Sequence, residues 1–494
     1  MKKLSLLLAL AMILSSLSGC IAPGKKSETE FLSVLTGESY MQEWNSDYME
    51  IIAEATYPVI SLYGDDAEKY PELKKALESL SAEKEKFGKE NFQTMVSEGY
   101  EWFNVSDWYE PFSSFESVKV RRADDAVLSL LFCGYEYRGG MHGIEYFKGE
   151  NFDVSTGERL KLTDIIKDKK ELSKAVSAEL ARHYADVEFF EDTDISEFME
   201  SEYSWTYDYN GITLYFGPYC LAPYAYGTQA VTITYDEYPD LFYDKVKSPS
   251  RFASEMTSGI PVFYDTDKDG ETEKISYTAF GSEIGEDGIF TINIGDEVYE
   301  EEIYFYEADV TIINTEKDTY LYAEFSMDND YRETRVYSIR DKVTYVDTIR
   351  ASTYYPIEGN VPLKGVITNP DKFKLGTRTY ILSTVIGIKD YYTGDNGLPV
   401  AYDDNYRFYI SIELTALKEF DAEIFDEYLE NKQGEMTVNA GDYLTYIATD
   451  NEKYVWFETE DYKIIRKEFK KDGYAVLIDG VEIYDLFDGM FFAG

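Results

Sequence analysis

The sequence predicts an α+β N-terminal half, built as an antiparallel sheet with packed helices, followed by a mainly β C-terminal half. Apolar residues recur at every third or fourth position within residues 31–104 and 169–184, which is the spacing of amphipathic helices. Beyond a break near residues 247–252 this spacing nearly disappears, and short segments that alternate apolar and polar residues take its place. A chain of 494 residues also exceeds the size of one hydrophobic core, so we expect several domains.

The first 20 residues have the pattern of an export signal. Lys2 and Lys3 precede an apolar run over residues 4–17, which is too short to span a bilayer comfortably. The run ends at Leu-Ser-Gly-Cys, which resembles the lipobox of bacterial lipoproteins and predicts lipidation of Cys20. An ordinary secretory signal with a chance cysteine is the alternative. We expect a tether over residues 21–45 and an exported protein. Its lipid would anchor it to the outer face of the bacterial cytoplasmic membrane or to the cell surface.

The composition indicates an acidic, folded and aromatic-rich protein. The chain has 94 acidic and 47 basic side chains, which gives a formal net charge of −47, and it contains 46 tyrosines. An aromatic content of 16% excludes a disordered acidic tail, because such tails are poor in aromatic residues. The charge repels nucleic acid and anionic lipid headgroups, so we predict no nucleic-acid binding, and it attracts cationic partners and divalent metals. Cys133 and Cys220 are predicted either as two buried free thiols or as one disulfide.

The N-terminal half is predicted to alternate helices and strands. Thr156-Gly157 supplies the turn of a hairpin, and Arg122 to Asp125 interrupts two strand runs. In chain order we predict a helix (residues 31–55), a strand (57–64), a helix (70–103) and two strands (118–137). A hairpin (151–162), a helix (169–184) and further strands (211–235) follow.

The C-terminal half is predicted to contain small β barrels or sandwiches. Residues 259–350 alternate in short runs separated by acidic turns, and the segments after residue 356 do the same. The last segments resemble an SH3-like barrel in pattern. Residues 420–432 have helical spacing, and we predict a helix there that covers one end of the barrel.

One acidic turn in this half has the pattern of a calcium loop. Oxygen ligands occupy positions 1, 3, 5 and 9 of a loop that begins at Asp265, and Gly270 stands at position 6, where such loops turn sharply. Position 12 is Ser276 instead of Glu, so the turn resembles the D-x-D-x-D-G loop of FG-GAP-type β repeats. A solvated acidic turn without metal is the alternative. The predicted ligands of a structural Ca²⁺ are Asp265, Asp267, Asp269, Glu271 and Glu273.

Three strings carry a resemblance to a known family. They are YRGGMHG from Tyr137, NFDVSTGERLKLTDII from Asn151, and GITLYFGPYCLAPYAYGTQAVTITYDE from Gly211. Together they resemble the PdaC/RsiV-like extracytoplasmic domain pair, although Met141 stands where that family usually has alanine. We predict a signal peptide (residues 1–20), a tether (21–45), a PdaC-like α+β domain (46–150) and an RsiV-like C-terminal domain (151–247). A β domain with the calcium-loop-like turn (255–355) and a β-rich C-terminal domain (356–494) follow.

The resemblance implies a binding function without catalysis. In this family the module either precedes a peptidoglycan deacetylase domain or forms the outer half of anti-sigma factors that bind C-type lysozyme. In that family an Asp and two His hold the deacetylase metal, and the histidines usually form an H-x-x-x-H-type pair. His142 and His183, the only histidines of this chain, are 41 residues apart. The lipoprotein signal leaves no cytoplasmic anti-sigma segment. The implied partner is C-type lysozyme, another cationic protein or peptidoglycan.

The candidate ligand-binding residues lie in the first and third strings. Glycines on both sides of His142 permit close backbone approach, and tyrosines combine a large rigid contact area with a hydroxyl group. In the structural alternatives, His142 fastens its loop and the tyrosines pack a core. No catalytic residue is predicted, because the chain has no G-x-S-x-G, H-E-x-x-H or P-loop string. The candidates are Gly139, Gly140, His142, Tyr219, Pro223, Tyr224 and Tyr226.

Two other function classes stay open. With 94 acidic residues, a pair of carboxylates could serve an enzyme that acts on peptidoglycan, although nothing in the sequence singles out one pair. A carbohydrate-binding protein or a structural envelope protein would also have this composition. Release of fragments from purified cell wall would identify the enzyme, whereas slowing of lysozyme without any release would identify the lysozyme binder.

Overall fold

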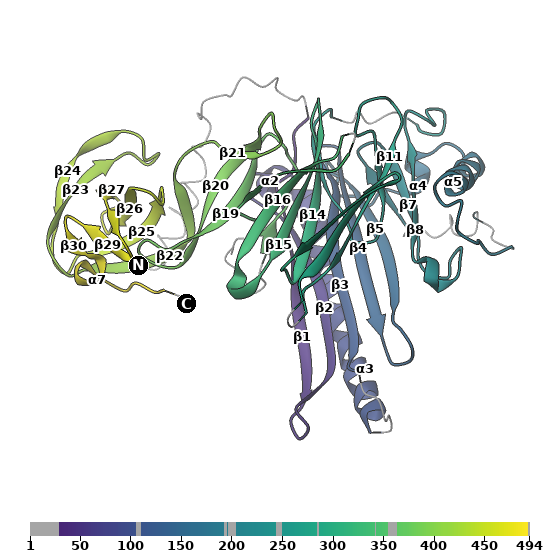
Figure 1. The fold of residues 1–494 in the computed structure, drawn as a ribbon, viewed down its shortest axis with the longest axis horizontal. Coiled ribbons are helices and arrows are strands. Elements are labelled where there is room, and N and C mark those ends of the chain that lie inside the picture. Colours follow the sequence, from purple (N-terminus) through teal and green to yellow (C-terminus); the bar gives the residue numbers. More distant parts are fainter. Residues whose placement is uncertain are drawn as a thin grey trace.

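The computed structural model describes residues 29–104, 110–191, 195, 204–243, 249–283, 286–340, 342–353 and 363–492. The expected signal peptide with Cys20 lies outside these ranges. Over the described residues the chain is mostly β, with its longer helices in the N-terminal half and a stalk that projects from the rest of the molecule (Figure 1). No helix in those ranges is both long enough and apolar enough to cross a membrane.

The first sheet has the strand order β18-β1-β2-β3-β4-β5. Its neighbours pair antiparallel except β2 and β3, which run parallel because helix α3 connects them. Helix α3 packs on this sheet through Leu73, Leu77, Leu80 and Met95. The elements are β1 (Val34–Asn45), β2 (Glu50–Leu62), α2 (Asp66–Lys69), α3 (Pro71–Phe103), β3 (Phe112–Ala123), β4 (Val127–Tyr137), β5 (Ile144–Asp153) and β18 (Leu363–Gly365).

The helix predicted over residues 31–55 is wrong, because β1 and the start of β2 occupy that segment. The two strands pair from Val34 opposite Leu62 to Asn45 opposite Glu50, with one shift of register between Glu43 and Trp44. Alternate residues of β2, such as Ala53 and Ala55, are buried on the sheet, so strand alternation prevails over helical spacing in this context. The tether predicted over residues 21–45 therefore needs correction as well, since its last part is β1. The predicted helix at residues 70–103 is confirmed as α3.

A smaller unit with its own core follows. Leu172, Val176 and Leu180 of helix α5 pack with Trp205 and Val231 of a three-stranded sheet. The helix predicted over residues 169–184 is confirmed, whereas the hairpin predicted over residues 151–162 is reduced to one isolated bridge. The elements are α4 (Leu162–Ile165), α5 (Lys169–His183), β6 (Trp205–Asp208), β7 (Gly211–Phe216), the 3₁₀ turn η1 (Tyr224–Tyr226) and β8 (Gln229–Thr234).

The third unit places two antiparallel sheets face to face, as in a β-sandwich. Their orders are β10-β11-β12-β13 and β17-β16-β15-β14-β9, and Phe290, Phe305, Phe325 and Tyr337 lie in the shared core. The elements are β9 (Phe252–Glu255), β10 (Val262–Tyr264), β11 (Glu273–Phe280), β12 (Gly288–Ile294), β13 (Glu297–Ile303), β14 (Glu307–Asn314), β15 (Thr319–Ser326), η2 (Asp328–Asp330), β16 (Arg332–Ser338) and β17 (Thr344–Ile349).

The C-terminal unit is also built from strands. The helix predicted over residues 420–432 is wrong, because β23 and β24 form a hairpin there and Phe420, Ala422 and Val438 enter the core. The likeness to FG-GAP repeats and to an SH3-like barrel stays a prediction. The large sheet has the order β19-β20-β22-β25-β26-β27-β23-β24, with β21 paired to β20 and β31 to β22, and β28-β29-β30 form a small sheet. The bounds are β19 (Phe373–Thr379), β20 (Val385–Thr393), β21 (Pro399–Ala401), β22 (Tyr406–Ala416), β23 (Phe420–Phe425), β24 (Lys432–Val438), β25 (Tyr443–Thr449), β26 (Tyr454–Thr459), β27 (Ile464–Glu468), β28 (Lys470–Asp472), β29 (Ala475–Ile478), β30 (Val481–Glu482), α7 (Ile483–Leu486) and β31 (Phe487–Asp488).

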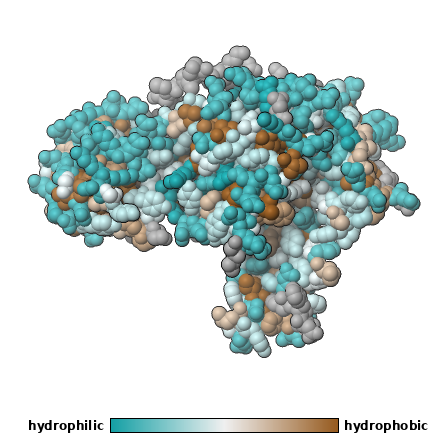
Figure 2. Space-filling model, viewed as in Figure 1, coloured by the Kyte–Doolittle hydropathy of each residue, from teal (hydrophilic) through white to brown (hydrophobic). Residues whose placement is uncertain are grey.

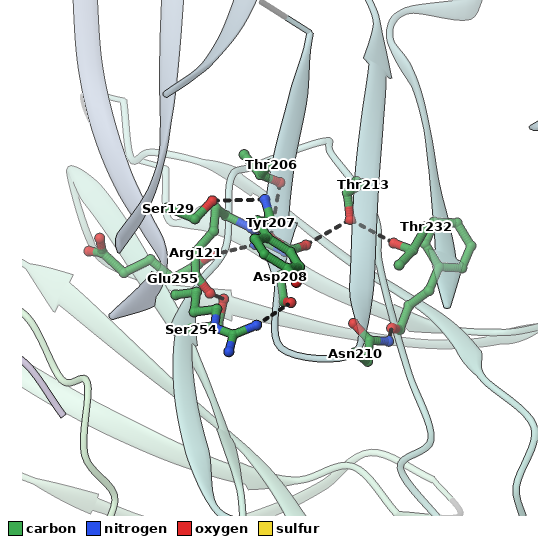
Figure 3. A network of polar contacts seen from close by, with 12 residues as sticks. Arg121, Ser129, Thr206, Tyr207, Asp208, Asn210, Thr213, Thr232, Ser254 and Glu255 are labelled. Carbon is green, nitrogen blue, oxygen red and sulfur yellow. Dashed lines mark hydrogen bonds and ion pairs between the residues drawn. The ribbon is translucent and has the colours of Figure 1, made fainter. Parts of the chain in front are cut away.

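A buried polar network joins the first three units (Figure 3). The Arg121 guanidinium on β3 forms an ion pair with the Asp208 carboxylate on β6 at 2.8 Å, and it donates to the Glu255 carbonyl on β9 at 2.6 Å. Thr213 on β7 donates a further hydrogen bond to Asp208 at 2.7 Å. Both charged side chains are only 2% exposed, so the ion pair fixes the relative positions of three sheets.

Candidate functional site

The structure brings two of the predicted segments into contact at the surface. His142 lies in the loop between β4 and β5, and Tyr219 and Tyr224 lie between β7 and β8. The imidazole of His142 stacks on the Tyr224 ring, with 3.9 Å between ring centroids and 20° between ring planes. The Tyr219 hydroxyl is 3.4 Å from His142 Nε2. We call His142, Tyr219 and Tyr224 the aromatic cluster.

Hydrogen bonds to one carbonyl hold the stacked pair in place. His142 Nδ1 is 2.9 Å from the Gly143 carbonyl oxygen, and the Tyr224 hydroxyl donates to the same oxygen at 3.2 Å. Because a carbonyl only accepts, Nδ1 donates the hydrogen bond to Gly143, and Nε2 faces the Tyr219 hydroxyl. The loop, the imidazole and Tyr224 therefore form one connected unit.

Backbone requirements explain the glycines of the loop. Gly139 and Gly140 have φ angles of +86° and +100°, which a residue with a Cβ rarely adopts. Gly143 is buried, and a Cβ there would overlap the Tyr135 ring. Sequence reasoning missed Tyr135. Tyr135 lies two residues before Tyr137 in the same predicted strand. Side chains at this spacing share one face of a sheet, and this spacing was the signal that could have identified Tyr135.

The outer members of the site are exposed to solvent. Tyr219 is 54% exposed and has a φ angle of +67°, a conformation that costs on the order of 1–3 kcal/mol for a residue other than glycine. Pro223 caps the 3₁₀ turn η1. Pro223 and Tyr226 are exposed beside the cluster, and within the described residues neither contacts His142. The predicted candidates thus comprise three touching rings, two loop glycines and two flanking residues.

Burial shifts the pKa values of ionisable groups in the segments that form the site. Burial, followed by the charge of Glu145, raises the pKa of Tyr224, so its hydroxyl remains a donor at neutral pH. In the described part of the chain, the Gly143 carbonyl orients the His142 ring and the Tyr219 hydroxyl lies beside Nε2. Cys133 and Cys220 are free thiols, and burial raises the pKa of Cys133 to about 11, which disfavours the reactive thiolate.

The second histidine has a structural environment. His183 Nε2 lies 3.3 Å from Glu179 on the same helix, and its ring packs on Phe263 of β10 with 4.5 Å between centroids. His183 therefore joins α5 to the β-sandwich and lies apart from the contacts of the aromatic cluster.

The acidic turn brings three of its five predicted metal ligands together. Asp265, Asp267 and Asp269 each offer a carboxylate oxygen within 4.8 Å of the others. The Asp265 carboxylate also accepts from the backbone N–H groups of Lys268 and Gly270, at 2.6 and 3.1 Å. Three carboxylates at this spacing repel one another, and hard oxygen ligands are those that Ca²⁺ prefers. These three residues could hold a metal ion.

The other two predicted ligands are used differently. Glu273 accepts from the backbone N–H and the hydroxyl of Thr266, at 2.7 and 2.8 Å, and the backbone N–H of Glu271 donates to Asp269. The Lys268 ammonium donates to the Asp265 carbonyl oxygen at 2.9 Å and to Asn314 Oδ1 at 2.7 Å, so a positive charge lies beside the triad. Glu271 and Glu273 lie outside the group whose carboxylates converge.

Addition of Ca²⁺ well above its dissociation constant is expected to raise the melting temperature by about 2–4 °C, because an ion that binds only the folded state stabilises it. Differential scanning fluorimetry with calcium and with chelator measures the shift. The Asp267→Asn/Asp269→Asn variant should lose the shift while keeping its fold. Equal melting temperatures with calcium and with chelator would show that the turn binds no ion.

Comparisons with known proteins identify one domain. Residues 163–236 match the family model described as "Protein of unknown function (DUF3298)". No curated protein matches the chain. A solved DUF3298 family member from Bacteroides fragilis NCTC 9343 is 18% identical with a TM-score of 0.34, covering 44% of this chain and 95% of its own. A DUF3298 family protein from Pseudomonas aeruginosa PAO1 is 18% identical with a TM-score of 0.29, covering 45% of this chain and 98% of its own. The chain therefore contains a DUF3298 domain over residues 163–236, which supplies Tyr219 and Tyr224 to the aromatic cluster.

Proposed function

We propose that this protein is a non-enzymatic surface lipoprotein, anchored through Cys20, whose aromatic cluster binds a cationic envelope protein such as C-type lysozyme. Binding would sequester the partner or sense its presence. The observation that carries the proposal is the exposed cluster itself, assembled from two distant loops in a chain whose net charge is −47.

Charge and aromatic contacts would contribute in different ways. The acidic field accelerates the encounter with a cationic protein, and this contribution weakens with salt. Rigid tyrosines that become buried at the centre of an interface slow dissociation, and they lose little conformational entropy when they do so. Stacking and hydrogen bonds already hold Tyr224 and His142, so little ordering is left for the binding step.

The finer PdaC/RsiV-like resemblance favours the same partner. The strings that carry it contain His142, Tyr219 and Tyr224, and the outer halves of such anti-sigma factors bind C-type lysozyme. The environment of the histidines is consistent with binding without catalysis, since each contacts structural partners in the described part of the chain. The β units would act as acidic spacers, stiffened by Ca²⁺ at the turn.

Calorimetric titration of residues 21–494 with C-type lysozyme tests this function. We expect saturable 1:1 binding at low salt that persists at about 0.3 M salt. At that salt concentration the Debye length is below ~8 Å, so attraction between more distant exposed charges is screened. Binding that disappears at the higher salt would indicate only non-specific attraction between an acidic and a basic protein. Release of fragments from purified peptidoglycan by this protein alone would contradict the non-enzymatic assignment.

A further inference from the structure

The stalk ends in an open strand edge and exposed aromatic residues. Strands β1 and β2 and helix α3 extend beyond the other elements, and the space-filling view shows this part standing clear of the rest (Figures 1 and 2). Strand β18 pairs with β1 only from Leu35 to Gly37, so within the described residues β1 is a free edge from Glu38 to Asn45. We call residues 38–54 with the end of α3 the stalk tip.

Hydrogen bonds hold a row of side chains on one face of β1. Trp44 Nε1 donates to Gln42 Oε1, Gln42 Nε2 donates to the Tyr40 hydroxyl at 2.7 Å, and that hydroxyl donates to Glu54 Oε2 at 2.8 Å. The Tyr40 and Trp44 side chains are nevertheless 54% and 49% exposed. Exposed aromatic rings with fixed orientation are suited to binding, because their rotamer entropy has been lost before a partner arrives.

The row faces away from helix α3. Tyr100 of α3 donates to Glu43 Oε1 at 3.2 Å, so Glu43 points toward the helix. Successive side chains of a strand point to opposite faces, which places Gln42 and its two hydrogen-bonded neighbours on the open face. Helix α3 therefore leaves the row uncovered.

Aromatic contacts connect the hairpin with the loop of the aromatic cluster. The exposed Tyr48 ring meets Phe103 at the end of α3 edge-on, with 5.4 Å between centroids. Trp102 beside it lies against Gly139, where an added Cβ would be 3.4 Å from the indole. Gly139 belongs to the same loop as His142, so aromatic side chains lead from the stalk tip to the aromatic cluster.

The charge of the stalk tip selects the kind of partner. Residues 38–54 and the last part of α3, residues 90–103, contain carboxylates and no Lys, Arg or His. From outside these ranges, Arg138 pairs with Glu98, and Lys119 and Lys364 lie near Glu38. An anionic lipid surface would be repelled by these carboxylates, whereas basic side chains would be attracted. Lysine and arginine also bind favourably over the faces of Trp and Tyr rings. The tip therefore matches the surface of a cationic protein.

We propose that the stalk tip is a second docking surface for a cationic protein and contacts the same partner molecule as the aromatic cluster. This inference rests on the proposed function, because it takes the partner's positive charge from there. The Tyr40–Gln42–Trp44 row supplies the rings and the surrounding carboxylates supply the complementary charge. Two separated contacts would orient the partner as well as hold it.

Titration of C-type lysozyme into the Tyr40→Ala/Trp44→Ala variant of residues 21–494, at about 0.3 M salt, tests the docking surface. We expect the dissociation constant to rise about tenfold or more, as for truncation of interface aromatic anchors. Tyr443→Ala/Tyr462→Ala is the matched control, because it removes two equally exposed tyrosines from the C-terminal unit. The control should bind as the wild type does, and both variants should keep the wild-type melting temperature.

The outcomes separate the two proposals. If Tyr40→Ala/Trp44→Ala binds as the wild type does while Tyr224→Ala binds weakly, the stalk tip is no docking surface and the proposed function stands. If the wild type shows no saturable binding, both proposals fail. Sedimentation of the wild type with phosphatidylcholine vesicles that Trp44→Ala abolishes would overturn the docking surface in favour of a lipid surface.

Discussion

Replacement of Asp208 by alanine is expected to lower the free energy of unfolding by about 3–5 kcal/mol, because it leaves the buried Arg121 charge without its partner. The guanidinium is 2% exposed and bonds the carboxylate through two nitrogens, at 2.8 and 3.3 Å. Although burial opposes the charged form, the Asp208 carboxylate holds the pKa of Arg121 well above its usual value. Arg121 would still carry its charge in the variant, because the ordinary pKa of a guanidinium lies far above neutral pH. Urea unfolding followed by tryptophan fluorescence measures the loss.

Two further variants show whether the ion pair is the cause. Glu171→Ala breaks the exposed contact between Glu171 and Lys174 and should leave the unfolding curve unchanged. Arg121→Met/Asp208→Leu removes both buried charges and should recover part of the lost stability, since no uncompensated charge remains. An Asp208→Ala protein as stable as Glu171→Ala would show that the network in Figure 3 contributes little to the joining of the three sheets.

Replacement of Tyr224 by alanine is expected to weaken binding to C-type lysozyme by about 30-fold or more. Truncation of an aromatic anchor at the centre of an interface typically costs about 2 kcal/mol or more of binding free energy, which corresponds to this factor. The variant loses the ring that stacks on His142 and the hydroxyl that donates to Gly143. The loop that carries His142 would then be free to move, so the partner would meet a less ordered surface. Calorimetry at about 0.3 M salt isolates this effect from long-range charge attraction.

The conservative Tyr224→Phe variant separates ring from hydroxyl. It keeps the stacking surface and loses only the hydrogen bond to Gly143, so its dissociation constant should lie between those of the wild type and Tyr224→Ala. Tyr462→Ala, on an exposed turn of the C-terminal unit, should bind normally. Wild-type affinity in Tyr224→Ala would remove the aromatic cluster from the interface, whatever its geometry in the free protein.

Several features of the fold could be predicted from local pattern. The helices α3 and α5 follow from apolar residues at helical spacing, and the strands of the sandwich follow from alternation between acidic turns. The converging carboxylates of Asp265, Asp267 and Asp269 follow from their spacing around Gly270. In each case the residues that decide the structure are neighbours in the chain, so their spacing is sufficient.

Predictions failed where pairing with another strand decides between two local patterns. Residues 34–45 form β1 because β2 pairs with them along their whole length, and residues 420–425 form β23 because β24 and β27 pair with them. Spacing alone described both segments equally well as helices. Exposure of Tyr40 and Trp44 on the stalk likewise depends on which face of β1 helix α3 covers, and that information is not local.

The sequence by itself determined the acidic and aromatic character of this protein, its division into a mixed and a β half, and the chemistry of each motif. Only the tertiary structure decided which motifs meet. His142 contacts Tyr219 and Tyr224, about 80 residues away in sequence, because the β4–β5 loop packs against the β7–β8 connection. The ion pair between Arg121 and Asp208 likewise joins residues that are distant in sequence. The physical reason is that backbone periodicity is set by adjacent residues, whereas contacts between side chains far apart in sequence are set by the burial of whole sheets.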